Sequence, residues 1–179
     1  MLLTLLQAYR DEHGLNGIYL IPSNLYGPGD HFEPDRSHVI PALIRRFLDA
    51  VESQADKVTV WGSGNATREF LYAPDAAEGI VLATERYDGR QPVNLGNGDE
   101  INIHSIAHLI AGFCGFEGVL AFDPGKPDGQ TRRCLDTSKA KEFGWEAKTQ
   151  LQDGLEATVA WYREKRRQDV LEGLSNAGV

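Results

Sequence analysis

The sequence is poor in the features that mark several common protein classes. It has only two cysteines, and Cys114 and Cys134 fit no paired spacing of a structural metal site, so we expect free thiols. It also has no long apolar run. The segment 1–13 turns charged by residue 10 and lacks the basic start and small-residue cleavage site of a signal peptide. These absences lead us to expect a cytoplasmic protein with no membrane partner.

An excess of basic residues is missing as well. The chain carries 18 Lys and Arg against 26 Asp and Glu, for a net charge of −8. A general nucleic-acid binder needs a basic footprint, so this class of partner is excluded. A phosphorylated small molecule is still possible, because a few local arginines suffice to bind it. The apolar content of 41% and the charged content of 25% are typical of a globular domain.

A glycine-rich dinucleotide-binding fingerprint is the third absence. Gly-x-Gly occurs at residues 62–64 and 96–98, but neither pair continues to the third glycine or opens a strand–helix–strand unit.

What is present is an alternation of helical and extended segments, which predicts an α/β fold. We expect Ser37 to cap one helix and Asn102 to cap another. The expected helices are 2–13, 38–52, 74–86, 101–113, 137–143 and 151–167, and the expected extended segments are 18–22, 57–61, 68–72, 93–95 and 119–122.

The most informative stretch follows the apolar strand 18–22. It reads NLYGPGDHF at residues 24–32 and continues as SHVIPALIRR at 37–46. A buried strand that ends in small polar residues marks the carboxyl edge of an α/β sheet, where ligands bind. The loop adds a histidine and two arginines at the next helix. The segment therefore predicts a site for an anionic, carbonyl-bearing substrate.

Together with WGSGNATREFLY at residues 61–72 and KPDG at 126–129, these segments resemble the GDP-L-fucose synthases, which are extended short-chain dehydrogenase/reductases. The resemblance covers roughly residues 1–165. It implies the C-terminal part of that fold: the end of a Rossmann-type doubly wound sheet plus a smaller α/β substrate-binding domain. Residues 1–25, with a return segment near 68–95, would belong to the NADP-binding domain. Residues 26–170 would mainly form the GDP-sugar domain, and 171–179 a frayed tail.

The resemblance also implies a reaction. GDP-4-keto-6-deoxy-D-mannose is inverted at C3 and C5 and then reduced at C4 with NADPH, by an enzyme that is a homodimer. The family's Tyr-x-x-x-Lys pair is absent, since the one tyrosine followed four residues later by lysine or arginine is Tyr162, near the C-terminus. We therefore expect a truncated C-terminal half that cannot catalyse the reduction alone.

His38 is the predicted catalytic residue. Inversion needs a base on one face and an acid on the other, and histidine titrates near neutrality. The resemblance assigns the acid role to His38, while its cysteine partner upstream is absent. The alternative for His38 is a capping contact at a helix start, and His31 is a weaker candidate.

His104 and His108 lie four residues apart, but no third ligand is evident, so we expect no metal site.

The cofactor edge is predicted at the end of the first strand. By resemblance the nicotinamide and ribose contact Pro22, Ser23, Asn24, Leu25 and His38. The alternative for residues 22–25 is an ordinary polar turn that leaves a strand.

Four residues are predicted to bind the substrate. The resemblance assigns the diphosphate to Arg46 and Arg68, the nucleotide to Trp61, and the guanine edge to Asp128, with added charge from Lys126. Each has an alternative. Arg46 could be an exposed charge on a helix, which is also our interpretation of Arg45, and Arg68 could form a salt bridge with Glu69 or another carboxylate. Trp61 could be a core residue, and Asp128 could be a turn residue.

Two other functions stay open at this point. One is a different NAD(P)-dependent sugar-nucleotide epimerase or dehydratase, against which SHVIPALIRR argues. The other is a non-catalytic GDP-sugar-binding module that folds as it stands.

Overall fold

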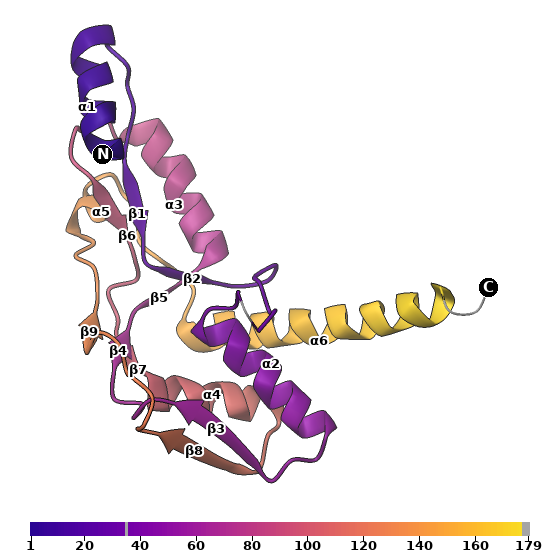
Figure 1. The fold of residues 1–179 in the computed structure, drawn as a ribbon. Coiled ribbons are helices and arrows are strands. Elements are labelled where there is room, and N and C mark those ends of the chain that lie inside the picture. The colour runs from indigo at the N-terminus through magenta and orange to yellow at the C-terminus, as the bar shows by residue number, and fades with distance from the viewer. Residues whose placement is uncertain (35, 177–179) are drawn as a thin grey trace. The chain divides into compact units, whose positions relative to one another are not determined.

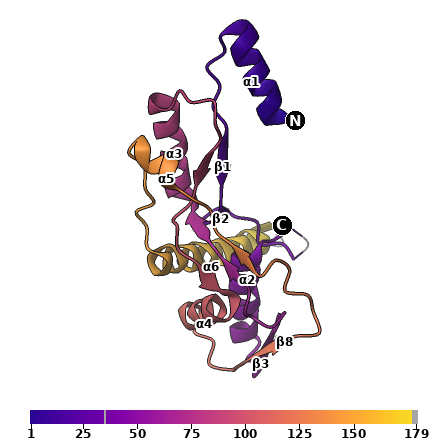
Figure 2. The same cartoon turned by 90° about the vertical axis from the view of Figure 1, so that its left-hand side faces the viewer.

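The computed structural model describes residues 1–34 and 36–176, the last four of these as backbone only. The chain divides into two compact units, each assembled from three separate stretches (Figures 1 and 2). Unit 1 combines Met1–Leu25, Thr67–Ile101 and Gln130–Thr149, and unit 2 combines Tyr26–Ala66, Asn102–Gly129 and Gln150–Val179. The NADP-binding and substrate-binding domains expected from the sequence remain predictions.

Unit 1 is built on short strand pairs. Strands β1 (Leu20–Pro22) and β6 (Val93–Leu95) run parallel and side by side in Figures 1 and 2. β2 (Asn24–Tyr26) pairs with β5 (Phe70–Tyr72), and β4 (Thr67–Arg68) lies between β7 (Ile101–Asn102) and β9 (Arg132–Arg133). The helices of the unit are α1 (Leu2–His13), α3 (Ala73–Arg86) and α5 (Ser138–Glu142).

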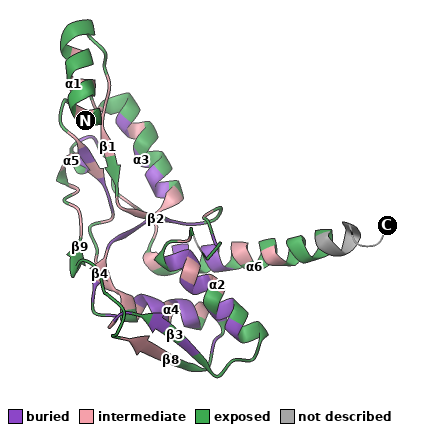
Figure 3. Ribbon diagram, in the orientation of Figure 1, coloured by how far each residue is buried: buried purple, intermediate pink, exposed green. Residues whose placement is uncertain are grey.

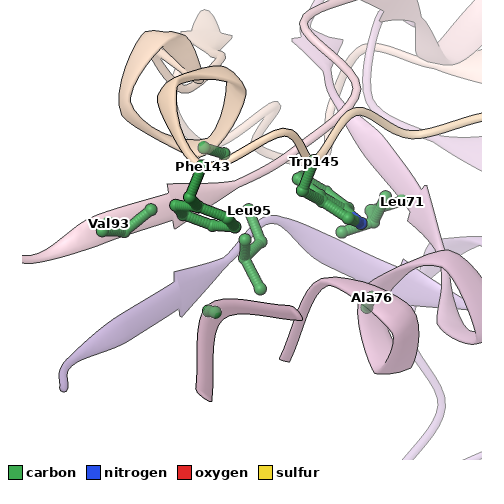
Figure 4. Close-up of a cluster of buried hydrophobic side chains, with 8 residues drawn as sticks. Leu71, Ala76, Val93, Leu95, Phe143 and Trp145 are labelled. Atoms are coloured by element: carbon green, nitrogen blue, oxygen red, sulfur yellow. The ribbon is translucent and has the colours of Figure 1, made fainter. Parts of the chain in front are cut away.

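The core of unit 1 joins β5 and β6 to α3, to α5 and to the segment after α5. Figure 4 shows the apolar side chains that point toward one another there. Trp145 is central, because its Nε1 donates to the carbonyl oxygen of Asp75 at 3.1 Å. A side chain at Gly79 would lie 2.6 Å from the indole, so α3 packs on it closely. The buried cluster consists of Leu71, Ala76, Ala83, Val93, Leu95, Ala140, Phe143 and Trp145.

Helix α1 ends at Gly14, whose φ of 66° lies in the left-handed region that favours glycine. Its broad apolar face predicts burial on two sides, but in this chain Leu2 is 68% exposed and Leu5 51% exposed. Figure 3 shows α1 in the colours of exposed and intermediate residues. Two ion pairs connect the helix to the rest of unit 1, one between Asp11 and Arg90 and one between Arg10 and Asp88.

Unit 2 packs three helices and a parallel strand pair around an apolar core. Helix α2 (Val39–Glu52) contacts β3 (Lys57–Trp61) and α4 (Ile103–Cys114), and α4 contacts α6 (Leu151–Asn176). β3 pairs with β8 (Val119–Asp123) along its whole length, ending at Trp61 opposite Asp123. The fully buried side chains include Ile40, Ile44, Phe47, Ile106, Ile110 and Leu155.

The structure confirms the mixed α/β class and corrects some local expectations. Helix α2 has His38 as its N-cap, so the predicted cap at Ser37 is wrong. The cap at Asn102 is confirmed, because its side chain accepts from the backbone N–H of Ser105 at 2.7 Å. Helix α6 extends through residues 171–176, which we expected in a frayed tail, and residues 177–179 lie outside the described part. Among the described residues, none of the helices combines the length and apolar character needed to cross a membrane.

Candidate functional site

The predicted cofactor edge lies in unit 1, at the end of β1. The backbone N–H of Ser23 continues the strand pairing by donating to the carbonyl oxygen of Leu95 at 2.8 Å. Ser23 Oγ is buried, and it has no hydrogen-bond partner among the described residues. Leu25 is 39% exposed. The strand end therefore offers a hydroxyl with unused hydrogen-bonding capacity, which fits the carboxamide of a nicotinamide, and Leu25 offers an exposed apolar side chain two residues later.

Glu69 is hydrogen-bonded to Asn24, which follows this strand end, and the sequence analysis named it only as an alternative ion-pair partner of Arg68. The residue is 1% exposed, and its two carboxylate oxygens accept from the backbone N–H groups of Gly98 at 2.9 Å and Leu135 at 2.8 Å. Its carbonyl oxygen accepts from Asn24 Nδ2 at 2.7 Å. Asn24 is thus positioned through Glu69. One signal was available: an acidic residue directly before the apolar run of β5.

His38 stands at the start of α2 in unit 2. Its carbonyl oxygen accepts from the N–H of Ala42 at 3.0 Å, which closes the first turn of the helix, and the residue is exposed. An exposed ring at a helix start can approach a substrate from solvent. The catalytic role of His38 remains a prediction.

Arg46 extends from α2 to the strand that carries Trp61. Its Nη1 donates to the carbonyl oxygen of Thr59 in β3 at 2.8 Å. Arg45 is half-buried and donates to the carbonyl oxygen of Phe32 at 3.2 Å, so reading Arg45 as an exposed helix charge is wrong. The two arginines line a hollow of about 210 Å³ with Phe32, Pro34, Ser37, Ala42 and Asp49. Because Asp49 lines the same hollow and pairs with Arg45, the lining carries charges of both signs.

Trp61 ends β3 with 67% of its surface exposed, so its alternative as a core aromatic is wrong. Lys126 Nζ lies 5.6 Å from the centre of the Trp61 ring, within range of a cation–π interaction. An exposed indole next to a cation can stack on a purine base and attract a phosphate.

Asp128 lies beside the same turn and binds the residue two positions after Trp61. Its Oδ1 accepts from the backbone N–H of Ser63 at 2.6 Å, and its Oδ2 accepts from Ser63 Oγ at 2.7 Å. Gly62 leaves the room for this contact, because a side chain there would lie 2.3 Å from Asp128 Oδ1. Sequence reasoning missed Ser63, although the Gly-Ser-Gly turn was its visible signal.

Arg68 belongs to unit 1, in the small sheet of β7, β4 and β9. Its Nη1 donates to the carbonyl oxygens of Thr67 at 2.7 Å and Gln130 at 2.6 Å, and Glu69 instead binds backbone groups. In the same sheet Arg132 pairs with Glu100, which also accepts from Thr67 Oγ1 at 2.8 Å. The bonds from Arg132 and Thr67 lower the pKa of Glu100 below its ordinary value of 4.5.

Three further histidines contact aromatic or acidic side chains. The ring centroids of His104 and His108 lie 4.3 Å apart, and His104 stacks on Phe122 at 4.8 Å. His31 lies 3.8 Å from the carboxylate of Glu33. Across residues 1–34 and 36–172, no three His, Cys, Asp or Glu side chains gather as metal ligands would.

The structure therefore brings some predicted residues together within each unit. In unit 2, Trp61, Lys126 and Asp128 meet at the ends of β3 and β8, and Arg46 reaches the same strand. In unit 1, Ser23 and Asn24 share the end of β1, and Arg68 lies in the small sheet. The assignment of these residues to cofactor or substrate remains a prediction.

Known proteins resemble this chain along most of its length. It is 47% identical over 158 residues to probable GDP-L-fucose synthase 1 of Oryza sativa subsp. japonica, which covers 88% of the chain and 48% of the relative. It is 39% identical over 171 residues to the GDP-L-fucose synthase of Escherichia coli (strain K12), covering 90% of the chain and 53% of that protein. The resemblance that the motifs indicated is confirmed. The chain spans about half the length of the curated relatives it matches.

The fold comparison agrees with the sequence comparison. The crystal structure of a GDP-L-fucose synthetase from Naegleria fowleri matches with a TM-score of 0.86 and 29% sequence identity, covering 93% of this chain and 53% of that one. The same enzyme bound to NADP matches with a TM-score of 0.85. The predicted fold class, part of an extended short-chain dehydrogenase/reductase, is confirmed.

A match to a protein-family model assigns the chain to a family. Residues 1–103 match the model described as the NAD dependent epimerase/dehydratase family, and this match covers more than half of the 179 residues. Its name states a nicotinamide dinucleotide as the cofactor. On this match the chain belongs to the NAD dependent epimerase/dehydratase family.

Proposed function

We propose that this chain carries the GDP-sugar-binding part of a GDP-L-fucose synthase. The substrate is GDP-4-keto-6-deoxy-D-mannose and the product is GDP-L-fucose. The observation that carries the proposal is the 47% identity to a curated plant GDP-L-fucose synthase over 88% of the chain. The homodimer and the cytoplasmic location that we expected from the sequence remain predictions.

The turn at the ends of β3 and β8 supports a nucleotide site. The exposed Trp61 ring offers a stacking surface for the base, and Lys126 adds a positive charge at its face. Arg46 binds the backbone of the same strand and leaves further guanidinium N–H groups for a diphosphate. Asp128 lies at the same turn, because its Oδ1 accepts a hydrogen bond from the backbone N–H of Ser63. We assign Arg68 of unit 1 to the diphosphate on its resemblance to the family.

The strand end of unit 1 supports a nicotinamide cofactor, and we propose NADPH. The buried and unsatisfied hydroxyl of Ser23 would bind the carboxamide, and Pro22, Asn24 and Leu25 would line the same edge. When bound, the nicotinamide supplies the hydride that reduces the C4 ketone. Glu69 contributes indirectly because it fixes Asn24.

His38 is the proposed acid of the epimerisation. By the resemblance, a cysteine upstream in the enzyme acts as the base: it takes the proton beside the ketone and leaves an enolate. Inversion is complete when a proton returns to the other face of that carbon. A histidine can deliver this proton near neutral pH and regain one from solvent. Its exposed position at the start of α2 permits both steps.

Calorimetric titration of the purified chain with GDP, and separately with UDP as the control nucleotide, tests the proposal. We expect binding that favours GDP and that Arg68→Ala abolishes. Arg167→Ala is the matched control, because Arg167 pairs with Glu164 on the exposed face of α6. This variant should bind GDP like the unchanged protein.

Two results would contradict the proposal. Equal affinity for GDP and UDP would remove the guanine nucleotide from the assignment. A folded chain that binds neither nucleotide would show that these residues do not form the GDP site in this chain. Circular dichroism before each titration establishes that the sample is folded.

A further inference from the structure

Two asparagine–glycine steps lie in connections of unit 1, Asn16–Gly17 between α1 and β1 and Asn97–Gly98 between β6 and β7. At such a step the backbone nitrogen of the glycine can lose its proton and attack the side-chain amide carbon of the asparagine, because glycine has no side chain in the way. A C–N bond forms and closes a cyclic imide, while the side-chain nitrogen leaves as ammonia. Water then opens the ring, so the asparagine becomes aspartate or isoaspartate.

The surroundings of Asn97–Gly98 oppose this reaction. The attacking nitrogen is the backbone N–H of Gly98, which donates to Oε1 of Glu69 at 2.9 Å, and Glu69 is 1% exposed. Removing this proton would place a second negative charge beside a buried carboxylate, which like-charge repulsion disfavours. Asn97 Oδ1 also accepts from the backbone N–H of Asp99 at 3.0 Å, which fixes the side-chain amide. We therefore expect this step to be slow.

The surroundings of Asn16–Gly17 favour the reaction. Asn16 is exposed, and the N–H of Gly17 donates to a neutral group, the carbonyl oxygen of Leu15, at 2.9 Å. Asn16 Oδ1 accepts from Arg10 Nη2 at 2.5 Å. Attack by Gly17 moves negative charge onto this oxygen. A guanidinium group that is already in place stabilises such a charge without having to rearrange.

Arg10 is held in place by Asp88. Its Nη2 donates to Oδ1 of Asp88 at 2.7 Å, its Nη1 donates to the carbonyl oxygen of Asp88 at 3.1 Å, and its side chain is 19% exposed. We propose that Asn16 is a self-modifying deamidation site, at which Arg10 stabilises the oxyanion. The product has a carboxylate beside Arg10, in the connection between α1 and β1. The modification requires no GDP-sugar, so it is independent of the proposed function.

Peptide mass spectrometry after incubation of the purified chain at mildly alkaline pH measures both steps. We expect Asn16 to be converted about tenfold faster than Asn97, because one step has a cation at the developing oxyanion and the other has a carboxylate at the attacking nitrogen. Fragmentation of the modified peptide distinguishes aspartate from isoaspartate. In concentrated urea both steps lose their contacts, so the two rates should become similar. Asn16→Asp, which lacks the amide, is the blank for the mass measurement.

Variants separate the charge of Arg10 from the stability of α1. Arg10→Gln should slow the conversion of Asn16 about tenfold, and Arg10→Lys, which keeps a positive charge, should retain part of the rate. Asp88→Asn is the matched control: it removes the ion pair but keeps the backbone bond to Arg10, so the rate should not fall. Asp11→Asn removes the other ion pair of α1 and should leave the rate unchanged.

Three results would overturn the proposal. Conversion of Asn16 that is slower in the folded chain than in urea would show that the fold protects this step. An unchanged rate in Arg10→Gln would show that the guanidinium has no part in the reaction. Equal slowing in Arg10→Gln and Asp11→Asn would assign the effect to the stability of α1. Circular dichroism establishes that each variant is folded, and Arg10→Lys replaces Arg10→Gln in these comparisons if the latter is unfolded.

Discussion

The two units are stabilised in different ways. Unit 1 has two buried carboxylates, Glu69 and Asp75, whose oxygens bind backbone N–H groups from distant parts of the chain. Unit 2 relies on apolar contacts between α2, α4 and α6, and many of its buried residues lie on α2 and α4 (Figure 3). The strands of unit 1 have only two or three residues each, whereas β3 and β8 of unit 2 have five, so the strands of unit 1 offer small apolar faces and polar bonds connect its segments.

Asp75 illustrates how a single side chain joins two segments of unit 1. It lies in the first turn of α3, where the helix dipole favours a negative charge. Its Oδ2 accepts from the backbone N–H groups of Lys148 at 3.0 Å and Thr149 at 2.8 Å, and its Oδ1 accepts from Thr149 Oγ1 at 2.9 Å. The end of the 130–149 stretch is therefore connected to α3 by polar bonds, and Trp145 packs beside them.

The largest effect should come from the apolar core of unit 2. Phe47 is fully buried, with its ring 5.5 Å from that of Phe116. Phe47→Ala removes this packing and leaves a cavity, so we expect a loss of about 4 kcal/mol in the free energy of unfolding. Urea unfolding followed by circular dichroism measures it. Phe47→Leu, which keeps most of the volume, should lose less than half as much, and equal losses from both variants would contradict an apolar packing role.

The second prediction concerns the polar core of unit 1. Glu69→Gln keeps the shape of the side chain but removes its charge and one of its two acceptor oxygens, leaving a buried N–H unsatisfied. We expect a loss of about 2 kcal/mol in the free energy of unfolding. Trp145, which is 2% exposed, is the tryptophan of unit 1, and its emission reports that unit during urea unfolding once Trp61 and Trp161 of unit 2 are replaced by Phe in every variant. Glu142→Gln on the exposed surface of α5 is the control, and an equal change in both variants would show that the burial of Glu69 is irrelevant.

These two residues also show what the sequence can predict. The expected helix 38–52 and the expected extended segment 57–61 correspond to α2 and β3. Glu69 was not predicted as a structural centre, because its partners lie 29 and 66 positions away along the chain. Long-range hydrogen bonds leave no periodic signal.

The long-range contacts of the candidate site could not be predicted from the sequence either. Trp61 and Lys126 were found from motifs that resemble a family, but the bond from Ser63 to Asp128 spans 65 positions and emerged only from the structure. Helical spacing also could not decide which of Arg45 and Arg46 reaches β3. Patterns thus located the chemistry, whereas the contacts that position it depend on how distant segments meet.

The two free cysteines give a smaller, more local comparison of the units. Burial raises the pKa of Cys114 in unit 2 to about 12, whereas Cys134 in unit 1 is half-buried. Burial and the charges of Glu69 and Glu100 raise the pKa of Cys134 as well. Because the thiolate is the reactive form, we expect iodoacetamide at pH 8 to label Cys134 well before Cys114. Mass spectrometry identifies the modified peptide, and Cys134→Ser should remove the fast phase. Faster labelling of Cys114 would show that unit 2 opens more readily than unit 1.

The smallest effect is a pH dependence at the surface of unit 1. Arg132 and Thr67 lower the pKa of Glu100 below its ordinary value of 4.5. As pH falls, the unfolded chain therefore takes up a proton at this position before the folded chain does. The stabilisation is complete above about pH 4.5 and is lost as pH falls through the lower folded value. Urea unfolding at pH 7 and pH 3 should show that Glu100→Gln loses less stability on acidification than the unchanged chain. Because Arg132 is 71% exposed, the difference should also shrink in high salt, and a salt-independent difference would place its origin in a buried group.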